Sequence, residues 1–163
     1  MKFLLVRSVK APQRAYGDAG IDCFVPHQTK EFEKDMREKN PDIEFTEIGF
    51  IVKPQQAVLI PLGIKSSFDP HIALMANNKS GVATKKQLVF GAQLIDSNYQ
   101  GEIHAHLINT GTEDQKIYYG DKIIQFVPVC IDPDEFTVET NEDNFYATKS
   151  ERGEGGFGST GDK

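Results

Sequence analysis

The chain has 163 residues, a length typical of one domain that buries its own hydrophobic core. Its net charge of −6 argues against a DNA or RNA partner, because an acidic surface repels a phosphate backbone. The apolar run at residues 3–6 is far too short for a signal peptide or a membrane span. We therefore expect an intracellular, cytoplasmic protein with no membrane partner.

Short strand patterns separated by turn residues account for most of the chain. Such a pattern, with a single helix, is typical of an antiparallel barrel or sandwich, so we predict an all-β fold. The predicted strands cover residues 2–9, 19–25, 50–52, 58–61, 63–66, 72–76, 115–118, 122–129 and 135–139. Two cysteines, Cys23 and Cys130, are expected to be reduced and buried, and together with four scattered histidines they show no zinc spacing.

One helix is predicted between Thr29, a suitable N-cap, and Asn40, which precedes a proline. Its apolar face consists only of Phe32 and Met36. We interpret residues 28–48 as a surface insertion that carries this helix and is not part of the core.

An acidic residue lies inside the sequence LIDSNYQG at residues 94–101. After Gly101, Ile103 alternates with polar neighbours in the period of a strand, so we predict a β-hairpin with Asp96 near its bend. A carboxylate at a hairpin mouth can orient and activate a water molecule. The alternative is that Asp96 is only a turn residue that bonds its own backbone.

Residues 79–81 combine the three groups that a compact anion site needs. Lys79 supplies charge, Ser80 a hydroxyl donor, and Gly81 lets backbone N–H groups approach a phosphate. A short helix after Gly81 would add a favourable dipole. The alternative is an ordinary polar loop. Asp22 and Gln125 each point away from the apolar residues beside them in predicted strands, as solvent-facing residues do.

The sequence RGEGGFGSTG at residues 152–161 is rich in glycine yet contains an arginine, an aromatic residue and two hydroxyls. We interpret it as a segment that becomes ordered over a ligand. Arg152, Ser159 and Thr160 would hold phosphates, and Phe157 would stack on a base. The alternative is a disordered tail.

Five stretches, in this order, resemble the five motifs of the trimeric dUTPase (deoxyuridine triphosphate nucleotidohydrolase) family. The third is a close match and the fifth is nearly complete, and together they extend from residue 19 to residue 161. They are AGID at 19–22, KSG at 79–81, LIDSNYQG at 94–101, GDKIIQ at 120–125 and RGEGGFGSTG at 152–161.

The resemblance implies a single domain, residues 1–163, with a distorted jelly-roll fold that forms a homotrimer. Its active sites would lie at subunit interfaces, and a C-terminal arm, residues 141–163, would close over a site. The implied reaction converts dUTP and water to dUMP and pyrophosphate, with Mg²⁺ on the triphosphate. This reaction keeps uracil out of DNA and supplies dUMP for dTMP synthesis.

The resemblance also implies a role for individual residues. Asp96 would activate the attacking water, Tyr99 would pack on the deoxyribose and exclude a ribose 2′-hydroxyl, and Asp22 would face hydrated Mg²⁺ through water. The uracil edge would be recognised by the backbone at Gln93, Leu94, Ile95 and His104, with Phe157 lying on the base. Phosphates would be held by Lys79, Ser80, Gly81, Gln125, Arg152, Gly158, Ser159 and Thr160.

Two positions depart from the family pattern. Lys79 stands where the family usually has arginine, which keeps the charge but loses the bidentate fork. Gln93 stands where the family usually has glycine, and we hypothesise that it alters base preference. These departures leave two alternatives open: a dNTP pyrophosphatase with altered base preference, and a non-catalytic nucleotide-sensing or protein-binding module. A related dCTP deaminase is a further alternative, but the acid base and the Arg-Ser-Ser type of second motif that it would need are not evident here.

Overall fold

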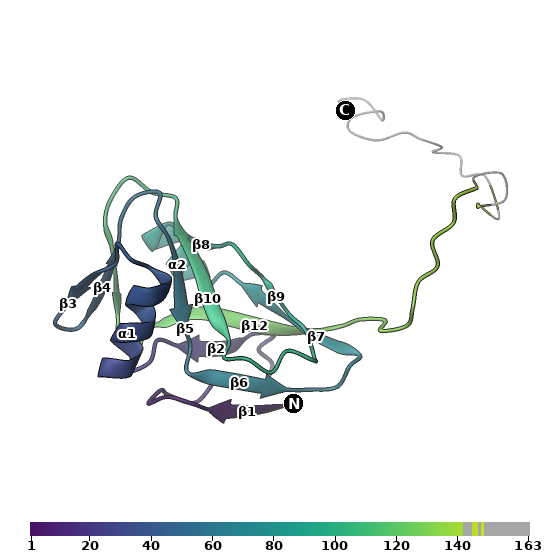
Figure 1. Cartoon of the computed structure of the whole chain (residues 1–163), viewed down its shortest axis with the longest axis horizontal. Coiled ribbons are helices and arrows are strands. Elements are labelled where there is room, and N and C mark those ends of the chain that lie inside the picture. The colour runs from purple at the N-terminus through teal and green to yellow at the C-terminus, as the bar shows by residue number, and fades with distance from the viewer. Residues whose placement is uncertain (142–144, 147, 149–163) are drawn as a thin grey trace. The chain divides into compact units, whose positions relative to one another are not determined.

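The computed structural model describes residues 1–141, 145, 146 and 148. The chain divides into two compact units, Met1–Pro133 and Asp134–Lys163, and every described helix and strand lies in the first (Figure 1). Among the described residues, no helix is long and apolar enough to span a membrane.

The first unit consists of short strands and two helices, which confirms the predicted all-β class. The helices are α1 (Lys30–Lys39) and α2 (Ser80–Lys86). The strands are β1 (Lys2–Leu5), β2 (Ile21–Phe24), β3 (Glu44–Thr46), β4 (Gly49–Val52), β5 (Ala57–Pro61), β6 (Ile64–Ser67), β7 (Ile72–Asn77), β8 (Leu88–Phe90), β9 (Leu94–Ile95), β10 (His104–Asn109), β11 (Gln115–Tyr118) and β12 (Lys122–Cys130).

The described strands pair only in the antiparallel sense and form small sheets of two to four strands. The strand orders are β1-β6, β5-β10-β8, β11-β4-β3 and β2-β12-β7-β9. Figure 1 shows β1 beside β6, with β12 running between β2 and β7. This last sheet brings together strands that are far apart in the sequence.

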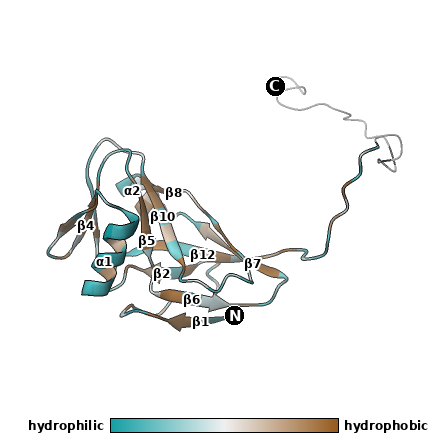
Figure 2. Ribbon diagram, in the orientation of Figure 1, coloured by the Kyte–Doolittle hydropathy of each residue, from teal (hydrophilic) through white to brown (hydrophobic). Residues whose placement is uncertain are grey.

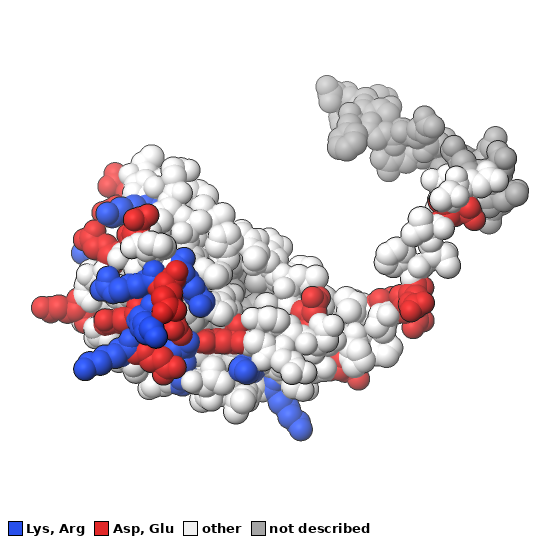
Figure 3. All heavy atoms as spheres, in the orientation of Figure 1, with Lys and Arg blue, Asp and Glu red and all other residues white. Residues whose placement is uncertain are grey.

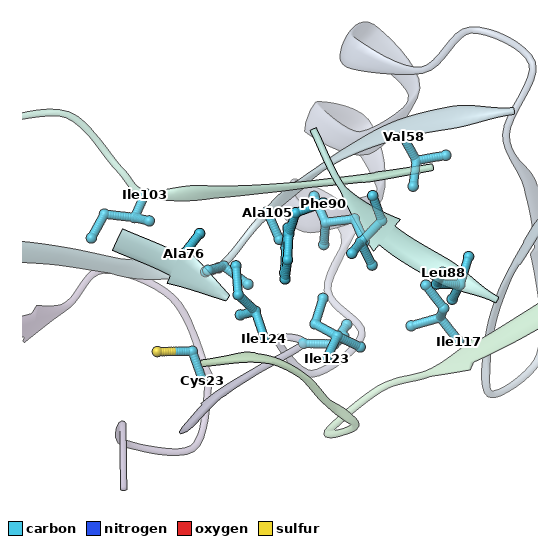
Figure 4. Close-up of a cluster of buried hydrophobic side chains, with 14 of the residues drawn as sticks. Cys23, Val58, Ala76, Leu88, Phe90, Ile103, Ala105, Ile117, Ile123 and Ile124 are labelled. Carbon is cyan, nitrogen blue, oxygen red and sulfur yellow. The ribbon is translucent and has the colours of Figure 1, made fainter. Parts of the chain in front are cut away.

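The inward-facing residues of these sheets form one hydrophobic core. Strand period two places Ala105 and Leu107 on the buried side of β10 and Ile103, just before the strand, on the same side, as the alternation predicts, and all three are fully buried. Figure 4 shows two of them with Ile124 of β12 and Phe90 of β8. The core thus connects the sheets.

Helix α1 contributes to this core. Thr29 caps it by accepting a hydrogen bond from the Phe32 N–H at 3.1 Å, as predicted. Although Figure 2 shows α1 as mostly hydrophilic, Phe32 and Met36 are both fully buried in the core cluster. The expectation that the helix is not a core element is therefore wrong, because two large side chains suffice to anchor a ten-residue helix.

The two strands of the predicted hairpin do not pair with each other. Strand β9, which precedes Asp96, pairs with β7 and not with β10, whereas β10 pairs with β8 and β5. The Asp96 segment therefore lies in the long connection between β8 and β10. A turn does follow Asp96, whose carbonyl accepts a hydrogen bond from the Tyr99 N–H at 3.2 Å. The predicted bend is present, but a non-local partner strand takes the edge that the hairpin would have used.

Two further expectations fail. Residues 135–139 are not a strand, and these described residues are exposed, so no partner strand stabilises their alternating pattern. Cys130, at the end of β12, is exposed, whereas Cys23 is buried as predicted, and both are free thiols. Burial raises the pKa of the Cys23 thiol to about 12, which keeps that thiol protonated.

Candidate active site

The motif around Asp22 lies next to two lysines. Lys79, immediately before α2, pairs with one carboxylate oxygen of Asp22, and Lys122, at the start of β12, pairs with the other at 3.0 Å. Burial would raise the pKa of Asp22, but the hydrogen bonds from the two lysines outweigh burial and hold that pKa below its ordinary value. Three of the predicted motifs therefore meet at one ionic cluster.

Gln125 fixes the geometry beside this cluster. It lies opposite Asp22 in the β2–β12 pairing, and its side-chain amide donates to the Asn78 carbonyl at 2.9 Å. Gly20 makes room for this side chain, because a Cβ added at that position would lie 2.2 Å from the Gln125 side-chain oxygen and would force it to shift. The predicted solvent-facing glutamine thus joins the loop before α2 to the entry of β2.

Helix α2 begins at Ser80, immediately after Lys79. No side-chain cap satisfies its first turn, and Gly81 is exposed with open space where a Cβ would lie. The backbone N–H groups of Val82 and Ala83 are both used by the Lys79 carbonyl. An incoming phosphate would therefore find charge and a hydroxyl at this turn, with room above Gly81.

The segment containing Asp96 extends from the far edge of the same sheet. Leu94 and Ile95 pair with β7 through Met75 and Leu74, and the Gln93 carbonyl accepts from the Ala76 N–H at 2.7 Å. Asp96 itself is exposed, and within the described residues no hydrogen bond to its carboxylate is formed. A carboxylate in this situation is free to hold a water molecule.

Tyr99 folds back onto the end of this segment. Its hydroxyl donates to the Glu102 carbonyl at 2.9 Å, and a Cβ added at Gly101 would meet that hydroxyl at 2.3 Å. The glycine therefore makes room for the ring, and Tyr99 as a whole is 42% exposed.

His104 hydrogen-bonds the same carbonyl through Nδ1, at 2.8 Å. Its Nε2 is buried and has no partner within the described residues. Desolvation lowers the pKa of His104 more than the hydrogen bond to the Glu102 carbonyl raises it. The neutral imidazole is therefore favoured, with its ring held by Glu102.

Strand β7 joins the two parts of the candidate site. Asn77, at its end, pairs with Gln125 of the ionic cluster, while Met75, two residues earlier, pairs with Leu94 of the Asp96 segment. One strand thus supports both groups of predicted residues. The remaining predicted site residues, Arg152, Phe157, Gly158, Ser159 and Thr160, lie outside the described residues.

Sequence reasoning missed three residues that organise these groups. Lys122 lies inside the quoted GDKIIQ stretch, so its position there was a usable signal. Glu102 and Arg7 gave no signal, because their ion pair joins residues 95 positions apart. A long-range pair of this kind is visible only in the folded chain.

The described residues do not form a metal site by themselves. Within that part of the chain, no three or more His, Cys, Asp or Glu side chains are grouped closely enough to hold an ion. Asp22 is a single carboxylate, and both of its oxygens already contact lysines. It fits at most a contact through water with an ion that another group carries, and Mg²⁺ in proteins often keeps several waters in this way.

Comparison with known proteins adds independent evidence. A family model described as dUTPase matches residues 45–161. The chain is 38% identical over 118 residues to the deoxyuridine 5′-triphosphate nucleotidohydrolase of Mannheimia succiniciproducens, covering 71% of this chain and 75% of that protein. It is 42% identical over 113 residues to the enzyme of the same name from Legionella pneumophila, covering 68% and 71%.

Solved structures show a similar fold. A dUTPase of Staphylococcus bacteriophage 80alpha, determined with dUpNHpp, aligns with a TM-score of 0.74 over 98% of this chain and 97% of that one, at 22% identity. A dUTPase from phage phi11 of S. aureus, described with a structural Mg(II) ion, aligns with a TM-score of 0.68 at 19% identity, covering 87% and 97%. At these identities the structural likeness supports the fold alone.

Proposed function

The chain belongs to the dUTPase family, and from this premise we propose that it hydrolyses dUTP to dUMP and pyrophosphate. The observation that carries the proposal is the family match over residues 45–161, which includes the KSG, LIDSNYQG and GDKIIQ motifs. Removal of dUTP keeps uracil out of DNA and provides dUMP for dTMP synthesis. The fold is the jelly-roll-like fold of this family.

In the proposed reaction, Asp96 is the general base. Its exposed carboxylate orients a water molecule, takes one proton from it, and directs the oxygen to the α-phosphorus of dUTP. The bond between the α-phosphorus and its bridging oxygen breaks, and pyrophosphate leaves. Tyr99 packs on the deoxyribose with its exposed face, so that a ribose 2′-hydroxyl would collide with the ring.

The phosphates are held by the turn before α2 and by Gln125. Lys79 must then exchange Asp22 for a phosphate oxygen, while Ser80 and the backbone at Gly81 donate hydrogen bonds. Lys122 remains on the other oxygen of Asp22 during this exchange. The cluster thus keeps one cation on its carboxylate while the other moves to the substrate.

In this proposal Mg²⁺ would accompany the triphosphate and would supply charge neutralisation to the leaving pyrophosphate. Asp22 would face the ion through water, because a lone carboxylate with lysine partners does not fit direct binding.

The base is recognised mainly by the backbone of Gln93, Leu94, Ile95 and His104. Gln93 is anchored by its own carbonyl on Ala76, which places its exposed side chain at the edge of this segment. We propose that this side chain influences base preference. Its replacement in Gln93→Gly is expected to change the relative rates on dUTP, dCTP and dTTP. Unchanged relative rates would show that the side chain does not reach the base.

We propose a homotrimer with sites at subunit interfaces and a C-terminal arm, residues 141–163, that closes over the nucleotide. Phe157 would lie on the uracil, and the distal phosphates would be held by Arg152, Gly158, Ser159 and Thr160. Closure would exclude water other than the nucleophile.

The test is pyrophosphate release from dUTP, dCTP, dTTP and UTP with Mg²⁺, beside an Asp96→Asn control. We expect much faster release from dUTP than from the other three nucleotides, and its loss in the control, because the amide cannot accept the proton. Fast release from another nucleotide would favour a pyrophosphatase with altered base preference. Tight binding of dUTP without release would favour a nucleotide-sensing module.

A further inference from the structure

The backbone of Glu102 holds both Tyr99 and His104, the two residues that the proposed function places at the sugar and the base. Its backbone carbonyl accepts the hydroxyl of Tyr99 at 2.9 Å and is contacted by Nδ1 of His104 at 2.8 Å. A shift of this one peptide group would therefore move both side chains together.

The side chain of Glu102 is itself held by three hydrogen bonds from two partners. Arg7 forms a bidentate pair with it, through Nε at 2.7 Å and Nη2 at 2.8 Å. The Gly63 N–H donates to the same carboxylate at 2.8 Å. The side chains of Arg7 and Glu102 are only 9% and 15% exposed, so solvent weakens this pair less than a surface pair.

Arg7 is in turn fixed by helix α1. Its Nη2 also donates to Asp35, and Nη1 lies 3.8 Å from Glu31. The hydrogen bond to Glu102 is the main reason that the pKa of Arg7 rises above its usual value, so the guanidinium stays charged. Figure 3 shows charged side chains of both signs gathered where α1 lies in Figure 1. The helix that the sequence presents as an insertion therefore reaches the candidate site through one arginine.

We propose that Arg7 and Glu102 form a clamp that positions Tyr99 and His104, so that deoxyribose binding and selection against UTP depend on an N-terminal arginine held by α1. This inference rests on the proposed function, because it uses the role of Tyr99 at the sugar. Neither Arg7 nor Glu102 needs to touch the substrate. They are positioning residues, which act through the backbone carbonyl of Glu102 that both Tyr99 and His104 contact.

Glu102→Gln is the variant of choice, because it keeps the side-chain shape and leaves Arg7 paired with Asp35. We expect KM for dUTP to rise about tenfold while kcat changes by less than about twofold, since ground-state and transition-state binding of the sugar weaken together. The ratio of kcat/KM for dUTP over UTP should fall by about the same factor. Arg7→Lys keeps the charge but loses the fork, so it should shift both quantities in the same direction by less.

The matched control is Glu44→Gln. Like Glu102, Glu44 forms an ion pair, in this case with Lys53 at 3.4 Å, but both of these side chains are more than half exposed. Glu44 lies on β3 and Lys53 just after β4. This control should leave KM and the dUTP over UTP ratio unchanged. The double variant Arg7→Lys/Glu102→Gln should be no worse than Glu102→Gln alone, because both substitutions weaken one interaction.

Hydrogen exchange of peptides covering residues 96–104 gives a readout that does not need activity. We expect faster exchange in Glu102→Gln than in wild type or Glu44→Gln. Unchanged exchange together with unchanged KM and dUTP over UTP ratio, even with a lower melting temperature, would overturn the clamp. If wild-type protein releases no pyrophosphate from dUTP, the proposed function fails, and the exchange rates alone still decide whether the clamp holds this segment.

Discussion

At the scale of single residues, Asp22 carries the most competing demands. Its carboxylate holds Lys79 and Lys122, and the proposed function asks it to face hydrated Mg²⁺ as well. These demands are compatible if the arriving triphosphate takes Lys79 and leaves one carboxylate oxygen for the ion's water shell. The apparent conflict is then a substrate-dependent exchange of partners.

Replacement Asp22→Asn tests this exchange. We expect the Mg²⁺ concentration for half-maximal pyrophosphate release to rise about tenfold, because loss of a residue that contacts a metal only through its ligands or bound waters typically weakens metal binding by this factor. Lys122→Met is the control, since it removes a cation from Asp22 but leaves the carboxylate. A higher KM for dUTP with an unchanged Mg²⁺ dependence would mean that Asp22 only orients the two lysines.

His104 gives the protein a predictable response to acid. Desolvation holds its pKa below the ordinary value near 6.5, with Lys39 and Arg7 acting in the same direction and Glu102 opposing them. The unfolded chain therefore binds the proton more readily than the folded one. The stability that neutral His104 contributes to the folded protein is fully present above about pH 6.5 and is lost as the pH falls toward the pKa of His104 in the folded protein.

The variant His104→Gln should remove this part of the pH dependence. We expect the difference in unfolding free energy between wild type and variant to shift in favour of the variant as the pH falls below about 6.5. Urea denaturation at several pH values would measure it, with exposed His27→Gln as the comparison. A difference that stays constant across this range would contradict the prediction.

At the scale of elements, α1 is attached by polar as well as apolar contacts. Asn40, just after the helix, is buried; its amide donates to the Met36 carbonyl at 2.9 Å and to the Leu59 carbonyl at 3.0 Å. Its side-chain oxygen accepts from the Leu59 N–H at 2.8 Å. One side chain therefore completes the helix end and mimics a strand neighbour for β5.

Asn40→Ala should lower the free energy of unfolding by about 2 kcal/mol, because it leaves the backbone N–H and carbonyl of Leu59 without their side-chain partner. Thr29→Ala, which removes only the N-cap at the exposed end, should cost about 1 kcal/mol. Chemical denaturation of both variants gives the comparison. If neither substitution changed stability, these polar contacts would not stabilise α1, and its attachment would rest on Phe32 and Met36.

The same contacts explain which elements the sequence could predict. The helix limits were predictable because the Thr29 cap and Asn40 stop are local signals. The pairing of β9 with β7 was not, because a two-residue strand has no pattern that distinguishes a distant partner from its neighbour β10. Likewise, the alternation at residues 135–139 resembles a strand, but no described strand pairs with it.

At the scale of the whole molecule, the motif sequences predicted which side chains lie together better than they predicted which contacts hold those side chains in place. KSG and GDKIIQ supplied Lys79 and Gln125, and the fold does gather them with Asp22 on one sheet. The ion pair of Arg7 with Glu102 was not predictable. These two residues come into contact only because β1 pairs with β6, which brings the N-terminal region to the connection before β10. The motifs are local sequence patterns that can be read along the chain, whereas long-range ion pairs depend on topology.

The division of the chain into two units leads to a prediction about the whole molecule. Every described core residue and strand lies within Met1–Pro133, so a chain ending at Pro133 should keep the melting temperature of the full protein within a few degrees. It should nevertheless lose most pyrophosphate release from dUTP, because Arg152, Phe157 and the neighbouring hydroxyls are removed. Full-length Phe157→Ala and Arg152→Gln, assayed beside it, separate base stacking from phosphate binding. Stable folding with full activity after truncation would show that residues 134–163 take no part in catalysis, and the phosphate contacts would then have to come from the turn at Lys79 and from Gln125 alone.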